Sequence, residues 1–388
     1  MAEQKVSEPT GVGGLVPPRA ETNPPAKGLR PFRKATILKY ISGATDTLAS
    51  LTAAAQPLGN RVLEGTGFLR YVDLVVQATT SGNAANVAFK ADAPWNAIQS
   101  LRFQATGTDI INLSGHQLYL ANLYGGFGVW PPQTSTDTNI YQAVTGSGST
   151  GGSFRFRVRV PLSINDRSLI GLLGNQAQST KYEMPIVIAP SSDIYSTAPT
   201  TAPSVSVTRL QGIATVPAPV DAYGQPQEQV PGHYGILHTL FAVQSEALAT
   251  SGAARVNHYL RGIGNILRYT IIVFRDSTGA RTDAMLPTNI TFFIGSDPIF
   301  TETAAQRRAI MLDQFGFDAP AGVLVYTWDD DFLPRAGFGL GDDFLDTTGI
   351  ANAQFMFDYP TFSNSPGTVV FIHDQLVVPS GLDYSAYM

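Results

Sequence analysis

The stretch Phe154-Arg155-Phe156-Arg157-Val158-Arg159-Val160 alternates strictly between apolar and cationic side chains. Successive side chains of a β-strand point to opposite faces of the sheet, so this period of two directs Phe and Val toward a core. The stretch therefore predicts a half-buried strand. We interpret the arginine face as solvated or as part of an interface, because tracking of nucleic-acid phosphates would need more basic residues and aromatic platforms beside it.

Strand-like composition recurs along the chain, in runs separated by polar and Gly-rich turns. The runs are Leu69–Val76, Tyr182–Ile188, Val205–Leu210, Leu267–Phe274, Asn289–Ile294, Val323–Trp328 and Thr368–Ile372. The turn clusters include residues 79–83, 146–153, 276–279 and 363–367. Many short strands with frequent turn signals favour β-sandwiches or barrels.

Helical patterns are few and short. Ser114 is a candidate cap for a helix that runs to about Leu123, and Asn165 for one that runs to about Leu173. A third helix is predicted after Asp297-Pro298, where Ala305, Ala309 and Leu312 repeat at helical spacing up to Gly316. We expect these helices to be insertions in an all-β fold.

Length and repetition indicate two similar halves. The 388 residues exceed the roughly 100–200 of a usual domain. The octapeptide from Leu69 resembles the one from Leu267, and each is followed by a polar turn and a Pro-x-Asn segment. Residues 190–232 are rich in proline. These features predict an arm at 1–34, a first sandwich at 35–225 and a second at 226–388.

The amino-terminal arm carries the clearest charge signal. The whole chain has a formal charge of −5, yet basic residues outnumber acidic ones before residue 40. Proline and glycine break any period in the arm, so little of it can be buried. Five basic residues gather at its end: Lys27, Arg30, Arg33, Lys34 and Lys39. A flexible tail and an arm that docks on a partner are both consistent with this composition.

Residues able to support catalysis or metal binding are sparse. The chain has no cysteine, which excludes disulfides and thiolate chemistry. None of its five histidines has the spacing of a helical metal clamp, although His233 and His238 with Glu228 could meet on folding. The Gly-rich segments lack the lysine of a phosphate loop, and turns explain them better.

An acidic segment is the remaining candidate for a ligand site. Its carboxylates are Asp329, Asp330, Asp331, Asp342 and Asp343, with Asp346 close behind. Carboxylates on loops can gather Ca²⁺, but this spacing is not that of an EF-hand. We expect a solvated or interface-paired loop, with a structural cation as the weaker alternative. No cofactor is predicted.

Six short segments follow one another in a recognisable order and spacing between about Gly65 and about Tyr359. They are Gly67-Phe68-Leu69, Gly115-His116-Gln117-Leu118, Val160-Pro161-Leu162-Ser163, Thr270–Phe274, Ala304–Ile310 and Gly322–Tyr326. In the order and spacing of these segments the chain resembles the double jelly-roll major coat proteins of tectiviruses, a group within the adenovirus-hexon-like lineage.

The resemblance implies two tandem eight-stranded jelly rolls in a structural protein without enzymatic activity. It implies homotrimers with a pseudo-hexagonal outline, which contact neighbouring trimers and penton or minor capsid proteins in the shell of a tailless bacteriophage, assembled in the host cytoplasm. It also places the arm near an internal membrane, and it implies no specific nucleic acid partner. The low charged fraction of 14% suits a chain whose surface is covered by neighbours.

Two other functions remain open. Jelly rolls also serve as carbohydrate-binding or glycan-cleaving scaffolds, which would place aromatic platforms beside paired carboxylates. Only three tryptophans are present, and no groove rich in them is apparent. A viral spike or receptor-binding protein would favour a distinct tip domain over two matched halves.

Overall fold

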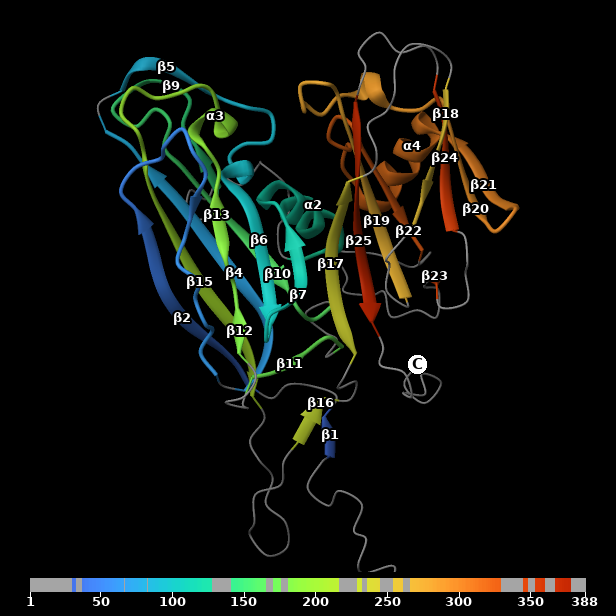
Figure 1. Ribbon diagram of the computed structural model, residues 1–388, viewed down its shortest axis with the longest axis horizontal. Coiled ribbons are helices and arrows are strands. Elements are labelled where there is room, and N and C mark those ends of the chain that lie inside the picture. The colour runs from blue at the N-terminus through green and yellow to red at the C-terminus, as the bar shows by residue number, and fades with distance from the viewer. Residues whose placement is uncertain are drawn as a thin grey trace, which may run out of the picture.

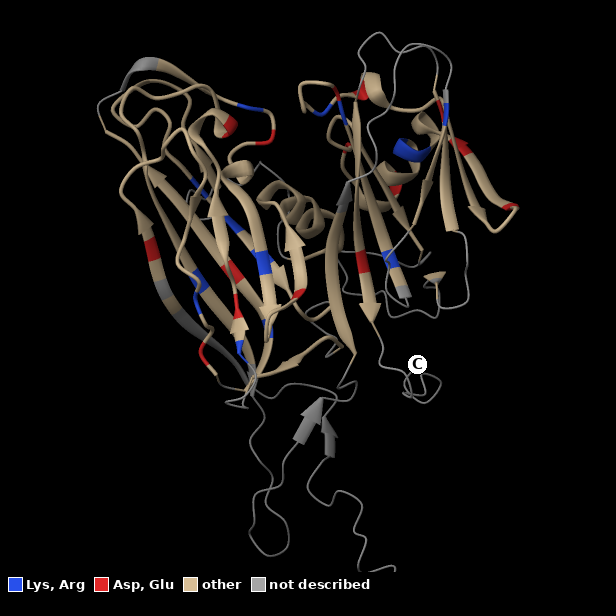
Figure 2. Ribbon diagram, in the orientation of Figure 1, with Lys and Arg blue, Asp and Glu red and all other residues tan. Residues whose placement is uncertain are grey.

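The computed structural model shows two β-sandwiches side by side (Figure 1). It describes residues 30–32, 37–65, 67–81, 83–127, 141–164, 170–175, 181–215, 229–231, 236–244, 254–260, 266–328, 345–347, 353–359 and 367–377. Charged residues are scattered thinly over both sandwiches (Figure 2). Within the described ranges, no helix is both long enough and apolar enough to cross a membrane.

The first half contains two principal sheets. One has the strand order β2-β15-β4-β10, and the other β3-β13-β6-β7. The bounds are β2 (Ile37–Leu48), β3 (Gln56–Pro57), β4 (Phe68–Thr79), β6 (Ile98–Ala105), β7 (Thr108–Leu113), β10 (Phe154–Pro161), β13 (Ile186–Ile188) and β15 (Ser204–Thr215). The shorter β8 (Tyr141–Ala143), β11 (Leu173–Gly174) and β12 (Tyr182–Glu183) pair with these sheets, while β5 (Asn83–Phe89), β9 (Gly146–Gly148) and β14 (Tyr195–Thr197) form a small third sheet.

The second half repeats this arrangement. Its strands follow the orders β22-β19-β25-β17 and β18-β24-β20-β21. The bounds are β17 (Leu237–Gln244), β18 (Ala254–Tyr259), β19 (Ile266–Arg275), β20 (Asn289–Ile294), β21 (Asp297–Thr303), β22 (Val323–Thr327), β24 (Ala353–Tyr359) and β25 (Thr368–Val377). The short β23 (Leu345–Asp346) pairs with β19.

Counting the principal strands of each half from one to eight gives the orders 1-8-3-6 and 2-7-4-5 in both halves. This is the connectivity of a jelly roll, in which eight strands form two facing sheets. The predicted all-β class, with two tandem eight-stranded jelly rolls and a few short helices, is confirmed. The first half ends its sheet at Thr215 and the second begins at Leu237, and the division at residue 225 stays a prediction.

The internal repeat corresponds to the third strand of each half, β4 and β19. In β4 the pairing with β15 skips Arg70, and in β19 the pairing with β25 skips Arg268. A skipped residue of this kind is a β-bulge, which bends the strand locally. The repeat therefore preserves an irregularity as well as a hydrophobic pattern, as expected for two copies of one sandwich.

Each half also carries one helix after its fifth strand: α2 (Gly115–Gly125) and α4 (Ala304–Phe315). Ser114 and Thr303 cap them, and in each capping box a glutamine three residues later returns the hydrogen bond. Both helices end at a glycine in the left-handed region, Gly126 or Gly316, each with φ 73°. Three further one-turn helices are η1 (Trp95–Ala97), α3 (Ser191–Ile194) and η2 (Asp283–Met285).

Two of the three helix predictions match the structure. The helix predicted from Ser114 is α2, and the one predicted up to Gly316 is α4, which begins only after β21. The helix predicted from Asn165 to about Leu173 is wrong at its carboxyl end. Residues 170 and 171 form a turn and Leu173 begins β11, because Gly171 adopts a φ of 84° and its backbone passes close to Leu162.

Candidate functional site: the junction between the two halves

The two halves share one continuous sheet. β7, the fifth strand of the first half, lies parallel to β17, the first strand of the second half. Leu240 is opposite Ile111, and Phe241 is opposite Asn112. Parallel strands need no hairpin between them, so elements far apart in sequence can join in this way. The pairing merges the two jelly rolls into a ten-stranded sheet.

Helix α2 packs into the same junction. All of its residues except Gln117 are buried, which is typical of a helix enclosed on every side. The Tyr269 hydroxyl of the second half donates to the carbonyl of Ala121 at 3.3 Å. The Tyr124 ring lies 4.9 Å from the Phe315 ring, which belongs to α4. Most buried apolar residues of both halves accordingly belong to one core cluster.

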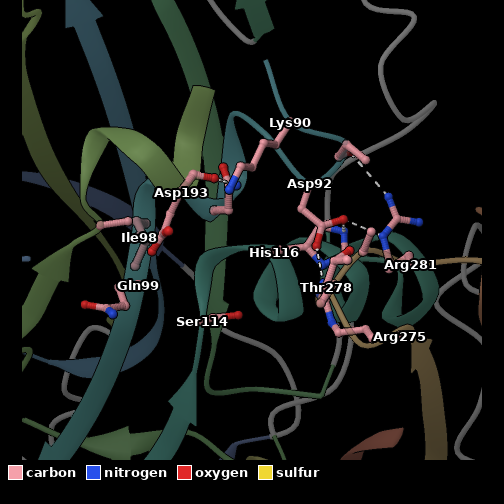
Figure 3. A pocket seen from close by; sticks show the side chains of 15 residues that line it. Lys90, Asp92, Ile98, Gln99, Ser114, His116, Asp193, Arg275, Thr278 and Arg281 are labelled. Atoms are coloured by element: carbon pink, nitrogen blue, oxygen red, sulfur yellow. Dashed lines mark hydrogen bonds and ion pairs between the residues drawn. The ribbon is translucent and has the colours of Figure 1, made fainter. Parts of the chain in front are cut away.

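An ionic cluster closes the junction at a surface cleft of about 590 Å³ (Figure 3). Asp92 of the first half binds Arg275 Nη1 at 2.7 Å and Arg281 Nε at 2.5 Å, both from the second half. His116 Nε2, at the start of α2, lies 3.5 Å from the same carboxylate. Three side chains, from α2 and from the second half, therefore surround the single negative charge of Asp92.

The protonation of this cluster follows from burial and neighbouring charge. Burial opposes ionisation of Asp92, but His116, Arg275 and Arg281 outweigh it and hold its pKa at about 2. Burial lowers the pKa of His116 to about 3, although Asp92 acts in the opposite direction. At neutral pH the cluster thus consists of one carboxylate, two guanidinium groups and a neutral imidazole.

Known proteins resemble the chain in structure and not in sequence. No family model and no curated protein matches it. The major capsid protein of Sulfolobus turreted icosahedral virus has 15% identity and a TM-score of 0.61, over 89% of this chain and 100% of that one. PBCV-1 VP54 has 14% identity and a TM-score of 0.62, over 91% and 97%. The major capsid protein P2 of bacteriophage PM2 has 10% identity and a TM-score of 0.52, over 89% and 100%.

The fold is a double jelly roll. The similarity extends over nearly the full length of each chain, so both halves and their side-by-side arrangement are included. At such low identity the comparison establishes the fold alone. The double jelly-roll expectation drawn from the sequence is thereby confirmed.

Most of the basic arm lies outside the described residues. This applies to Lys27, Arg33 and Lys34. Arg30 is in β1 (Arg30–Phe32), which pairs in parallel with β16 (Gln229–Pro231) beyond one end of both sandwiches (Figure 1). Lys39 is in β2, where its backbone is opposite Ile213. The pairing of β1 with β16 therefore places Arg30–Phe32 beside Gln229–Pro231, which lies between the last strand of the first half and the first strand of the second.

The acidic segment is also largely outside the described residues. This applies to Asp329, Asp330, Asp331, Asp342 and Asp343, while Asp346 is in β23. In the part of the chain that is described, no group of three or more acidic or histidine side chains could hold a metal ion. The cation hypothesis for the acidic segment stays untested.

The arginine row on β10 differs in part from the sequence interpretation. Arg159 donates from Nε to buried Asp73 at 2.8 Å, and its guanidinium lies 3.6 Å from the centre of the Tyr71 ring. Arg157 also binds Asp73. Arg159 is only 12% exposed, so this end of the row is an internal ion-pair network and not a solvated face. Sequence reasoning missed Asp73 because its partners follow it by more than eighty residues.

The site considered for His233, His238 and Glu228 stays untested, since His233 and Glu228 lie outside the described residues. His238 Nε2 is 3.0 Å from Asp374, which also accepts a bond from Arg268 Nη1 at 3.0 Å. All three side chains are buried on adjacent strands of the second jelly roll. They form a structural charge network, because each buried charge has a partner.

Proposed function

We propose that this chain is a viral major capsid protein whose structural unit is a trimer of double jelly rolls. The supporting observation is that the two jelly rolls have the same strand order and are fused side by side through β7 and β17. Structural similarity to viral major capsid proteins extends over nearly the whole chain. Three such chains supply six similar jelly rolls. Six similar jelly rolls in a ring would form a pseudo-hexagonal capsomer, a shape that can tile a flat facet.

The protein acts as a building block and not as an enzyme. Its ionic clusters pair buried charges with each other: Asp92 with two arginines, and Asp374 with Arg268 and His238. Such groups stabilise a fold, and the rigid junction between the halves fixes the spacing that a regular shell needs. We place the protein in the virion shell, with neighbouring trimers and with penton or minor capsid proteins as its partners.

The basic arm would face a membrane inside the shell of a tailless bacteriophage assembled in the host cytoplasm. The position of β1 beyond one end of the two sandwiches supports this arrangement, because an arm attached there could run beneath the jelly rolls (Figure 1). Each basic residue near an anionic bilayer contributes roughly 1 kcal/mol of attraction, and salt screens it. Five such residues give a reversible tether.

Light scattering of the purified protein tests the capsomer proposal. The expected mass is three times the 41.5 kDa of the chain. A stable monomer over the whole accessible concentration range would overturn the proposal.

Sedimentation with vesicles tests the arm separately. Glutamine replaces Lys27, Arg30, Arg33, Lys34 and Lys39 in one variant, and Arg255 and Lys181 in a control variant. At low salt, the wild type and the control should sediment with vesicles of phosphatidylglycerol and phosphatidylcholine. The amount of the arm variant that sediments with them should be at least tenfold smaller. Equal retention of the arm variant would contradict a membrane-facing arm.

A further inference from the structure

The exposed face of α4 has no counterpart on α2. Both helices follow the fifth strand of their jelly roll and begin with the same capping box. Elements of both halves cover α2, but α4 exposes Ala305, Ala309, Ile310 and Leu312. Ile310 is 45% exposed and Leu312 44%. Ala305, Ala309 and Leu312 share one face of the helix at i, i+4 and i+7, and Ile310 lies at the other edge of its exposed side. Exposed apolar side chains gathered on one side of an element indicate a surface that a partner covers.

Two strand edges show the same asymmetry. Within the chain, the fifth strand of the first half (β7) pairs with the first strand of the second half (β17). The fifth strand of the second half is β21, and the first strand of the first half is β2. Both are terminal in their sheets, so each leaves one edge unpaired with any described strand. They lie at opposite sides of the molecule, β2 at the left and β21 at the right of Figure 1.

The helix caps align the fifth strands residue by residue. Asn112, which is opposite Phe241 in the junction, lies two residues before the cap Ser114. Thr301 lies two residues before the cap Thr303. Thr301 is therefore the counterpart of Asn112 on the free edge of β21.

The bulges in the third strands align the first strands in the same way. Each bulged arginine is followed by a tyrosine, Tyr71 or Tyr269. In the second half the next residue, Thr270, is opposite His373, which is in turn opposite Phe241. The corresponding residues of the first half are Val72, Gln211 and Ile41. Ile41 is therefore the counterpart of Phe241 on the free edge of β2.

We propose that a second copy of this chain docks on β21 and on the exposed face of α4, and that it does so through its own β2 edge. This contact repeats between chains the β7–β17 junction found within a chain, with Thr301 opposite Ile41 of the neighbour. A head-to-tail contact produces a closed ring when a whole number of equal rotations completes a full turn. If each jelly roll is rotated by one sixth of a turn relative to the next, three chains with two jelly rolls each close the ring.

This inference rests on the proposed trimer and specifies the surfaces that form it. The exposed edge of β21 and the apolar face of α4 occupy the positions that β7 and α2 occupy inside the chain. Covering them removes both an unpaired strand edge, which is prone to aggregation, and an exposed apolar patch. A second copy of the chain carries a first jelly roll related to the one whose partner surfaces, β7 and α2, are covered inside the chain. An unrelated partner would not be expected to fit both β21 and α4.

Disulfide trapping tests the register directly, because the chain has no cysteine of its own. The variant carries Ile41→Cys and Thr301→Cys, and copper-phenanthroline serves as the oxidant. Directly paired residues on neighbouring strands lie within the roughly 4.4–6.8 Å between Cα atoms that a disulfide spans. The expected product on a non-reducing gel is a covalent trimer, since every chain contributes both cysteines. A control with Thr47→Cys and Thr301→Cys is out of register and should cross-link at least tenfold less.

The outcomes separate the two proposals. If the wild type is trimeric and the Ile41/Thr301 pair cross-links no better than the control, the trimer uses other surfaces, and this inference falls while the capsomer proposal stands. If the wild type is monomeric, both fall.

A surface substitution provides a second test that does not depend on cysteine geometry. Ile310→Lys should weaken association of the chains at least tenfold, measured as the concentration at which trimers dissociate. Val62→Lys is the matched control, because Val62 is an equally accessible aliphatic residue, 55% exposed, outside the proposed contact. Trimers of unchanged affinity in Ile310→Lys would overturn the inference.

Discussion

The Asp92 carboxylate of the first jelly roll binds the Arg275 guanidinium of the second at 2.7 Å, and this ion pair joins the two halves at their surface. It lies beside the start of α2, while β7 and β17 join the halves through backbone pairing. The junction thus combines a strand pair, a buried helix and an ionic cluster. Rigidity of this junction is what the proposed function requires, and each component can be tested.

Removal of the shared carboxylate should destabilise the chain. Asp92→Asn leaves Arg275 and Arg281 without their anion, and we expect the free energy of unfolding to fall by about 2 kcal/mol. This is less than the roughly 3–5 kcal/mol for a fully buried pair, because Arg275 is 22% exposed. Urea denaturation measures the loss.

The exposed pair of Arg255 and Asp358 supplies the control for this experiment. Arg255 is 65% exposed, and Asp358→Asn should cost at most about 1 kcal/mol. Equal losses in Asp92→Asn and Asp358→Asn would contradict a special role for the junction cluster.

Close packing of α2 against the second half should make Gly125 intolerant of any side chain. A Cβ at this position would lie 2.4 Å from Phe127 and 2.6 Å from the Tyr269 hydroxyl. Gly125→Ala should therefore lower stability by about 1–3 kcal/mol, although alanine favours helices. Gly59→Ala, where no atom lies within 4 Å, should be nearly neutral. A stabilised Gly125→Ala protein would show that the halves are not packed as described.

Buried histidines should make the protein less stable as pH falls. Burial lowers the pKa of His258 to about 4 and that of His373 to about 4, against about 6.5 in the unfolded chain. Between these values the unfolded state binds more protons, so stability declines as pH falls from about 6.5 to 4. The His258→Phe variant, whose ring would lie against Phe357 and Phe371, should lose less stability over this interval. Urea denaturation at several pH values would contradict this account if both proteins had the same pH dependence.

The arginines of β10 should contribute unequally to the stability of the protein. Arg159→Met removes a partner of buried Asp73 and the stacking on Tyr71, and it should cost about 2–3 kcal/mol. Arg155 forms no ion pair within the described residues, so Arg155→Met should change stability by about 0.5 kcal/mol or less. Thermal unfolding of the two variants compares them, and a larger loss for Arg155→Met would refute the assigned network.

Local patterns predicted the elements of the fold well. The alternation from Phe154 to Val160 is strand β10, with its apolar residues buried as expected. The run Asn289–Ile294 matches β20 residue for residue. These predictions worked because one face of each strand is buried, which imposes the period of two on the sequence. The repeat worked for the same reason, since Leu69 and Leu267 have equivalent positions.

Long-range features could not be predicted in the same way. The contact of Asp92 with Arg275 and Arg281, and that of Asp73 with Arg159, join strands and loops far apart in sequence, and no local period marks them. The apolar repeat of Ala305, Ala309 and Leu312 was visible, but it lies on the exposed face of α4. A helical period indicates that a face is covered and does not say whether the cover belongs to the same chain.

Electron microscopy of the purified protein is the most direct test of the central claim, that the junction between the jelly rolls is repeated between chains. Class averages viewed along the ring axis should show six similar lobes in particles that contain three chains. Particles with two lobes, or three-chain particles without a six-lobed outline, would contradict it.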